Sequence, residues 1–308
     1  MIPDGSGAPK LAPSSGRNLL DWTPVAFDGA AQSPLVWADL RGYARNAPFF
    51  SRTTDAWRRR GATDAVRTDL SALPVLDPAL DPDLIIAHSS RAGSTLLARL
   101  ATAEEGSILV SEPRILLRLL EHHLAGMLDA PIGPVLQAVV RLQGRRRPDA
   151  QRYVLKLNSQ ATRFLPQIRR AFPRTPILWL QRRPVEVVGS NLGRPAAGCP
   201  KRPEHIADWV VRRVALAFLG ATAFVDRDMQ ILDYRDLREP DWPGLAAVLG
   251  MDLTSVTLAR MQDVARLDAR TGIPFMPHDR APVPLAVQSI VRETLDPMYE
   301  ALRVRRAA

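Results

Sequence analysis

The sequence predicts an α/β fold, in which a mainly parallel central sheet carries helices on both faces. Between residues 84 and 192, short apolar runs with the length of buried strands alternate with longer helical patterns. Strands that alternate with helices form parallel βαβ units, so helices cover the sheet from both sides. A length of 308 residues, 46% of them hydrophobic, is ample for a core of this kind.

The expected elements follow in chain order. Strands are expected at 84–88, 107–110, 152–156 and 176–181. Helices are expected at 94–104, 114–127, 132–143, 160–172 and 184–192, then at about 206–225 and 284–303. Ligands of such folds bind beyond the carboxyl ends of the strands, so side chains just after each strand are the first candidates for a functional site.

The N-terminal region differs in composition from the rest. Residues 1–34 are rich in Gly, Pro, Ser and Ala and predict a loose arm. Residues 35–308 are then expected to form one α/β domain. In its first part, short helices are expected near Leu35–Tyr43 and Thr53–Arg60.

The segment from Leu84 to Leu97 predicts a strand, a loop of small residues and a helix. Such a loop points backbone N–H groups at one spot, where the positive end of the helix dipole also lies. Arg91 would add a charged donor for a phosphate or sulfate. An ordinary strand–turn–helix with a solvated Arg91 is the alternative.

The loop does not follow the nucleotide-triphosphate pattern of Gly, four residues and then Gly-Lys-Ser/Thr. If Gly93 is the second glycine, His88 stands in the place of the first and Ser94 in that of the lysine. Only Thr95 fits the pattern. The missing lysine argues against chemistry at a terminal phosphate, and a sulfonate carries less charge and can be transferred without magnesium. The loop is therefore better interpreted as a site for a sulfonate donor.

The hexapeptide from Arg91 to Leu96 resembles the 5′-phosphosulfate loop of the P-loop sulfotransferases, which use 3′-phosphoadenosine 5′-phosphosulfate. That loop commonly reads Arg-Ser-Gly-Ser/Thr-Thr-Leu. An arginine at its start makes this chain similar to the tyrosylprotein and many bacterial members, whereas the cytosolic small-molecule branch usually has lysine. The resemblance implies that the donor is bound by Arg91, Ala92, Gly93, Ser94 and Thr95.

A second segment is similar to the family's 3′-phosphate motif, an arginine at a strand end, a proline two residues on and a serine eight residues after the arginine. Arg182, Pro184 and Ser190 match it. The resemblance implies that Arg182 supplies charge and Ser190 a hydroxyl hydrogen bond to the 3′-phosphate. Arg183 departs from the family's usual Asn or Asp. A basic loop that caps a helix is the alternative.

Three residues are candidates for the chemistry. By resemblance, Glu112 takes the proton of the acceptor; it could instead be a first-turn carboxylate of the helix that Pro113 begins. Lys156 is one of three lysines in the chain and follows an apolar strand. Its ammonium would stabilise charge on the leaving group, unless it is a snorkelling strand-end lysine. His88, at the mouth of the loop, could orient the loop or assist.

Two further segments fit the family less specifically. Ile231–Leu237 resembles a strand that ends in Tyr-x-Asp-Leu, and the following short helix ends in Leu249-Gly250. The segment Arg270-Thr271-Gly272 resembles, loosely, a C-terminal loop that reaches the 3′-phosphate in the cytosolic branch. The loop 193–204 is expected either to cover the cofactor or to be a plain connector.

Composition narrows the function classes. The single cysteine, Cys199, excludes a disulfide framework and a cysteine metal site, and no metal is expected. With no apolar run of membrane length and no signal pattern, the chain is expected to be cytoplasmic. A formal charge of +9 suits a polyanionic cofactor or nucleic acid. However, aromatic residues are only 6% and no basic helix interleaves them, which argues against nucleic acid as the main partner.

The expected function is transfer of a sulfonate from 3′-phosphoadenosine 5′-phosphosulfate to a hydroxyl or amine of a small-molecule or peptide acceptor. A divergent P-loop kinase and a non-enzymatic basic binding protein on the same fold are the alternatives. The missing lysine weighs against the kinase, and Glu112 weighs against the pure binder. The sequence names neither the acceptor, nor the residues that stack on adenine, nor the oligomeric state.

Overall fold

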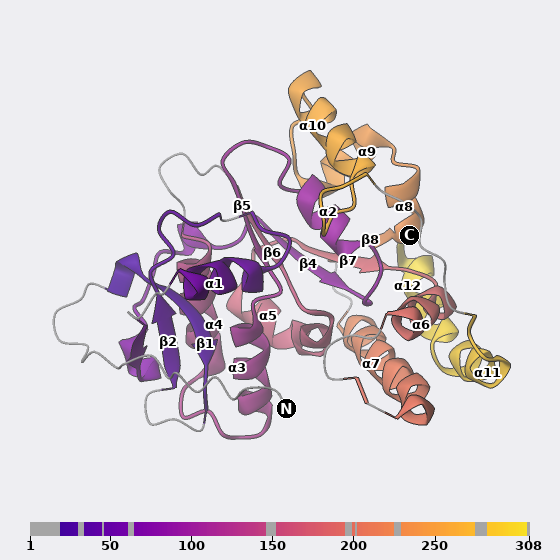
Figure 1. Cartoon of the computed structure of the whole chain (residues 1–308), viewed down its shortest axis with the longest axis horizontal. Helices are drawn as coiled ribbons and strands as arrows, with labels where there is room; N and C mark the ends of the chain where they lie inside the picture. Colours follow the sequence, from indigo (N-terminus) through magenta and orange to yellow (C-terminus); the bar gives the residue numbers. More distant parts are fainter. Residues whose placement is uncertain are drawn as a thin grey trace.

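The computed structural model describes residues 19–29, 34–44, 46–60, 65–145, 152–194, 199–200, 202–224, 229–274 and 282–306. A five-stranded sheet lies at its centre, and a smaller three-stranded sheet lies to one side (Figure 1). Of the predicted N-terminal arm and the predicted loop 193–204, residues 1–18, 30–33, 195–198 and 201 lie outside the described residues.

The central sheet is parallel throughout, with the order β5-β6-β4-β7-β8. Its strands are β4 (Leu84–His88), β5 (Ser107–Ser111), β6 (Arg152–Lys156), β7 (Ile177–Gln181) and β8 (Met229–Asp233). The chain runs from β4 to the β5 edge, returns through β6, and then crosses β4 to reach β7 and β8. The direction of winding therefore reverses beside β4, which is where open α/β sheets form a ligand crevice.

Helices cover both faces of this sheet. In β4, Ile85 and Ala87 belong to the core shared with α3 to α7, whereas Leu84 and Ile86 belong to the core shared with α2, α9 and α10. The helices are α1 (Phe50–Arg59), α2 (Ser94–Leu100), α3 (Arg114–Leu124), α4 (Ile132–Gln143), α5 (Leu165–Ala171), α6 (Pro184–Gly193), α7 (Pro203–Ala223), α8 (Tyr234–Arg238), α9 (Trp242–Leu249), α10 (Ser255–Arg266), α11 (Leu285–Thr294) and α12 (Asp296–Arg306). The predicted fold class is confirmed.

The N-terminal region folds differently from the prediction. β1 (Thr23–Phe27), β2 (Leu35–Ala38) and β3 (Val66–Thr68) form an antiparallel sheet. The prediction of a loose arm is therefore wrong for β1, and the helix predicted at Leu35–Tyr43 begins as a strand. The apolar side chains decide the outcome, because Trp37 is fully buried and its indole N–H donates to the Thr68 hydroxyl at 2.8 Å.

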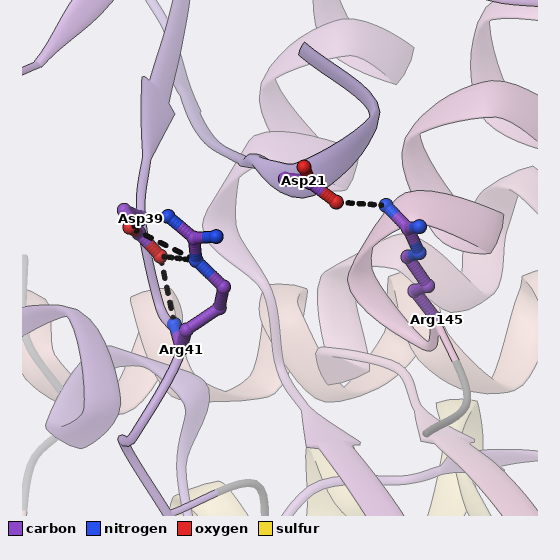
Figure 2. Close-up of polar contacts among 4 residues, drawn as sticks. All are labelled: Asp21, Asp39, Arg41 and Arg145. Carbon is purple, nitrogen blue, oxygen red and sulfur yellow. Dashed lines mark hydrogen bonds and ion pairs between the residues drawn. The ribbon is translucent and has the colours of Figure 1, made fainter. Parts of the chain in front are cut away.

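Exposed ion pairs accompany this small sheet (Figure 2). Arg145, just after α4, donates to Asp21 at 3.3 Å, and Arg41 forms a two-pronged contact with Asp39 at 2.6–3.1 Å. Pairs as exposed as these contribute about 0–1 kcal/mol each. The buried aromatic side chains, rather than these ion pairs, hold the small sheet against the rest of the molecule.

Three predicted elements differ in detail from the structure. The predicted strand end at Tyr234–Leu237 is the helix α8, because Asp233 and Asp236 form a capping box with bonds of 3.1 and 2.8 Å. The predicted helix 160–172 begins as a 3-10 segment, Ser159–Phe164, before α5. The predicted C-terminal helix is two helices, α11 and α12, which meet at Leu295. Three further 3-10 turns are Leu19–Asp21, Leu70–Ala72 and Pro78–Leu80.

Candidate functional site

The loop between β4 and α2 has a strained backbone. Ser90 and Arg91 have φ values of 69° and 46°, in the left-handed region that non-glycine residues rarely adopt. Gly93 has φ 86°, and a Cβ atom there would lie 2.9 Å from the Tyr234 ring. Strain of this kind persists only where the surrounding structure enforces it, and it concentrates at binding sites.

His88 is one of the groups that enforce the loop conformation. The Ser90 N–H donates to His88 Nδ1 at 3.1 Å, so Nε2 carries the proton and donates to the Leu157 carbonyl at 3.1 Å. Burial, assisted by the charge of Lys156, lowers the pKa of His88 to about 3. The ring is neutral with both nitrogens engaged, so His88 orients the loop and is poorly placed to take a proton.

Glu112 and Lys156 form an ion pair at the carboxyl ends of β5 and β6. Lys156 is fully buried, which excludes a snorkelling side chain, and its ammonium donates to Glu112 Oε1. The backbone N–H of Glu112 donates to the Lys156 carbonyl at 2.7 Å, and Glu112 has φ 52°. Asn158 Nδ2 lies 3.5 Å from Glu112 Oε2. Glu112 is thus engaged by Lys156 rather than by the start of α3.

Glu112 and Lys156 each shift the pKa of the other toward its charged form. Burial alone would raise the pKa of Glu112, but the Lys156 ammonium outweighs it and holds that pKa below its ordinary value. Burial lowers the pKa of Lys156, and the Glu112 carboxylate opposes the shift. Each group thus favours the charged form of the other, so any ligand that draws Lys156 away would leave a buried carboxylate with a rising pKa.

Arg91 belongs to the loop, and Arg182 contacts the loop from the end of β7. A guanidinium N–H of Arg91 donates to the Arg194 carbonyl. Burial, together with the charges of Arg270 and Arg194, lowers the pKa of Arg91 to about 10, so it remains charged at neutral pH. Arg182 donates to the Arg91 carbonyl at 3.0 Å and thereby ties the loop to the end of β7.

Arg182 is more engaged than the sequence predicts. Its Nε donates to Glu186 Oε2 at 2.7 Å, and its guanidinium lies 4.2 Å from the centre of the Tyr234 ring. Part of its charge is therefore neutralised within the protein. Ser190 lies on α6, on the wall of the same cavity as Arg182, so the structure brings both predicted 3′-phosphate residues to one site.

A cavity of about 1400 Å³ opens at the carboxyl ends of the strands. The predicted site residues on its walls are His88, Arg91, Gly93, Ser94, Thr95, Glu112, Arg182 and Ser190. Ala92 is buried in the core beside α2, and Lys156 lies behind Glu112. Ligand cavities usually measure about 300–1,000 Å³, so this one has room for a nucleotide and a second substrate.

Several cavity residues were not predicted, among them Phe49, Asn158, Trp209 and Arg213, whereas Arg270 belongs to the loosely matched segment 270–272. Arg213 lies 4.5 Å from the centre of the Trp209 ring, and Lys156 Nζ lies 5.4 Å from that of Phe49. Asn158 could have been found, because it follows β6 by two residues. Phe49, Trp209 and Arg213 come from segments that only the tertiary fold brings to the sheet, and no spacing in the sequence predicts their position.

Two features are absent from the residues that the structure describes, a cluster of metal ligands and a helix that could cross a membrane. No group of three or more His, Cys, Asp or Glu side chains there is placed to hold a metal ion. Among the helices of the described part, none combines the length and apolar character needed to cross a membrane.

Comparison with known proteins gives distant structural likenesses. No protein-family model matches the chain, and no curated protein does. The sulfotransferase domain of the Synechococcus PCC 7002 olefin synthase is 18% identical, with a TM-score of 0.44 over 71% of this chain and 94% of that one. A sulfotransferase from Alicyclobacillus acidocaldarius is 12% identical, with a TM-score of 0.46 over 74% and 96%.

A sulfotransferase from Mycobacterium tuberculosis H37Rv is 13% identical, with a TM-score of 0.44 over 79% of this chain and 81% of that one. Similarities at this level do not bear on activity. The function must be argued from the cavity itself.

Proposed function

We propose that this protein transfers a sulfonate group from 3′-phosphoadenosine 5′-phosphosulfate to a hydroxyl or amine of a small-molecule or peptide acceptor. The observation that carries the proposal is the convergence, in one cavity, of the strained arginine loop after β4 with the Glu112–Lys156 pair after β5 and β6. An anion site beside a paired acid and base is what group transfer from an anionic donor requires.

The two motif arginines fit the two ends of such a donor. Arg91 and the loop amides would bind the phosphosulfate, and Arg182 with Ser190 would bind the 3′-phosphate. Glu186 already neutralises part of Arg182. The remaining charge and the Ser190 hydroxyl therefore favour one phosphate over a more highly charged chain of phosphates.

The residues divide the transfer step between them. The acceptor oxygen or nitrogen forms a bond to sulfur while the bond from sulfur to the 5′-phosphate oxygen breaks, and the bonding electron pair stays on that phosphate oxygen. Glu112 takes the proton of the acceptor. Lys156 stabilises the charge that develops on the leaving phosphate.

The ion pair couples these two roles. Lys156 holds the pKa of Glu112 low while the two are bonded. When Lys156 turns toward the negatively charged donor, burial of Glu112 is no longer offset, and its pKa rises. Donor binding would thus convert Glu112 from a weakly basic ion-pair partner into a competent base.

A panel of nucleotides tests the proposal against its alternatives. Thermal unfolding would be followed with 3′-phosphoadenosine 5′-phosphate, with ATP and magnesium, and with GTP and magnesium. A ligand present at 100 times its dissociation constant adds about 2.7 kcal/mol of stability. We expect the 3′,5′-bisphosphate to give the largest shift. A larger shift from ATP would favour a kinase, and equal small shifts from all three would favour a general basic binder.

A further inference from the structure

The turn that follows α10 carries an arginine into the cavity. Asp268 Oδ1 accepts hydrogen bonds from the backbone N–H groups of Arg270 and Thr271, each at 2.9 Å, and from the Thr271 hydroxyl at 2.9 Å. The Gly272 N–H donates to the Asp268 carbonyl at 2.8 Å, and Gly272 has φ 76°. The Asp268–Gly272 turn is therefore closed by its own hydrogen bonds and presents Arg270 in a defined direction.

The helix before the turn fixes its position relative to the phosphate loop. Met261 of α10 is fully buried in the same core as Leu97 and Leu100 of α2, the helix that begins at the loop. The two helices pack against each other. Because α2 and α10 are joined through this core, Arg270 is held in register with the loop that carries Arg91.

Arg270 lies at the reaction end of the cavity. Its guanidinium is 5.8 Å from the centre of the Phe49 ring, and Lys156 Nζ is 5.4 Å from that same ring. The charge of Arg270 contributes to the lowered pKa values of His88, Arg91, Glu112 and Lys156. One guanidinium thus acts on groups from both the donor side and the acceptor side.

The guanidinium of Arg270 has no acidic partner in the part of the chain that the structure describes. It lies against the Phe49 ring, and its charge acts on the carboxylates of Glu112 and Asp268 without a direct ion pair to either. Arg182, by contrast, is paired with Glu186. A charged fork that lines a cavity beside other cations, with no direct ion pair to a carboxylate, is suited to an anion supplied by a ligand.

We propose that Arg270 binds the sulfonate group while it passes from the donor to the acceptor. The inference rests on the proposed function. Arg270 would donate hydrogen bonds to the non-bridging sulfonate oxygens, Arg91 would hold the phosphate from which sulfur departs, and Lys156 would face the bridging oxygen. No bond to the guanidinium forms or breaks, and the acceptor proton still goes to Glu112. The loose sequence match of this turn to a 3′-phosphate loop would then be misleading, because Arg270 would serve the opposite end of the nucleotide.

Two nucleotides that differ in the sulfonate separate these possibilities. Isothermal titration would measure the affinities of 3′-phosphoadenosine 5′-phosphosulfate and 3′-phosphoadenosine 5′-phosphate for the wild type and for Arg270→Ala. Arg270 is exposed, so its removal should not unfold the protein. Losing a charge-assisted contact should weaken the phosphosulfate about 10- to 100-fold and the bisphosphate less than about 3-fold.

Arg260→Ala is the matched control. Arg260 lies on α10, the helix before the turn, and pairs with Glu105 at 3.0 Å, away from this cavity. Arg260→Ala removes one positive charge, as Arg270→Ala does, and should change the affinity for each of the two nucleotides less than about 2-fold. A second variant, Asp268→Ala, frees the turn and should weaken the phosphosulfate selectively, though less than Arg270→Ala does.

Each outcome decides the inference. Equal losses for the two nucleotides in Arg270→Ala would place Arg270 on a phosphate that both share, and would overturn it. Unchanged affinity for both nucleotides would overturn it as well. If the wild type bound neither nucleotide, the proposed function itself would fail. If the wild type bound both and Arg270→Ala lost the same affinity for each, only the inference about Arg270 would fail.

Discussion

Strand β6 carries a buried cation at each end, and the two are held in different ways. At its start, Arg152 donates to the carbonyls of Ala101 and Gly250, both at 2.9 Å, and to that of Leu249. At its end, Lys156 donates to the Glu112 carboxylate in the cavity. Burial lowers the pKa of both cations. Arg152 is satisfied by backbone that cannot leave, whereas Lys156 is held by one side chain that a ligand can replace.

The different contacts of Arg152 and Lys156 indicate different roles for the two buried charges. The carbonyls around Arg152 follow the ends of α2 and α9, so Arg152 fastens two helices to the sheet. Glu112, the partner of Lys156, has a positive φ and lines the cavity. We infer that the first cation is structural and the second functional, and the predictions below test that division.

The largest expected effect is on turnover in Lys156→Met. Removing a charged group that stabilises the leaving phosphate should slow hydrolysis of the phosphosulfate donor about 10²–10³-fold. The assay needs no acceptor, since water takes the sulfonate and the release of 3′-phosphoadenosine 5′-phosphate is measured. A wild-type rate in Lys156→Met would remove this residue from the mechanism.

The next largest effect is on folding, in Arg152→Met. The change leaves buried carbonyls at the ends of two helices without donors and should lower the free energy of unfolding by about 3 kcal/mol. Urea denaturation measures the loss. Lys156→Met should cost less, because the Glu112 carboxylate that it frees can take up a proton as its pKa rises, whereas the backbone carbonyls around Arg152 have no such alternative. If Lys156→Met proved the more destabilising of the two, the structural and functional assignments would have to be exchanged.

A smaller effect is expected in the pH dependence of stability. The pKa of His88 is about 3 in the folded protein, below its ordinary value near 6.5. The unfolded chain therefore binds more protons between these values, and the stability that His88 contributes is lost as pH falls from 6.5 toward 3. Between pH 7 and pH 5 the loss should be about 2 kcal/mol.

His88→Asn provides the comparison for this pH dependence, because its amide oxygen can still accept the Ser90 N–H. The variant should lose less stability than the wild type over the same interval, as measured by urea denaturation at both pH values. Parallel losses in the two proteins would mean that His88 does not stay neutral in the fold.

The smallest effect is expected at the exposed pair of Asp21 and Arg145 (Figure 2). Asp21→Asn should change the free energy of unfolding by less than about 1 kcal/mol, and nucleotide affinity should be unchanged. Asp21→Asn is therefore the control for a charged residue that neither stabilises the core nor lines the cavity. A loss as large as that in Arg152→Met would show that the small sheet depends on this contact.

Local patterns in the sequence predicted the central sheet well. The bounds of β4, β6 and α4 coincide with the predicted ranges, because each is a compact apolar run or a regular amphipathic pattern. The small sheet was missed because Pro24 and Gly29 resemble loop signals, and because β2 is paired with a strand far along the chain, at Thr68. A proline is tolerated in β1 because it is an edge strand.

The residues of the candidate site also include some that the sequence could predict and some that it could not. That Arg91, Glu112 and Lys156 lie at one edge of the sheet could be predicted, because the carboxyl ends of adjacent parallel strands must meet. The roles given to them come from the resemblance. For His88 the sequence left two roles open, to orient the loop or to assist, and the choice depends on the Leu157 carbonyl, which the fold brings from another strand end. The position of Arg270 could not be predicted either, since it depends on the packing of α10 against α2.

The most direct test of the account compares 3′-phosphoadenosine 5′-phosphate with adenosine 5′-phosphate, which lacks only the 3′-phosphate. Titration calorimetry would be done on the wild type and on Arg182→Ala. The account predicts that the wild type binds the bisphosphate at least about 10-fold more tightly, from one charge-assisted contact, and that Arg182→Ala loses this advantage. Equal affinity of the wild type for the two nucleotides would contradict the claim that the cavity holds two separate anion sites.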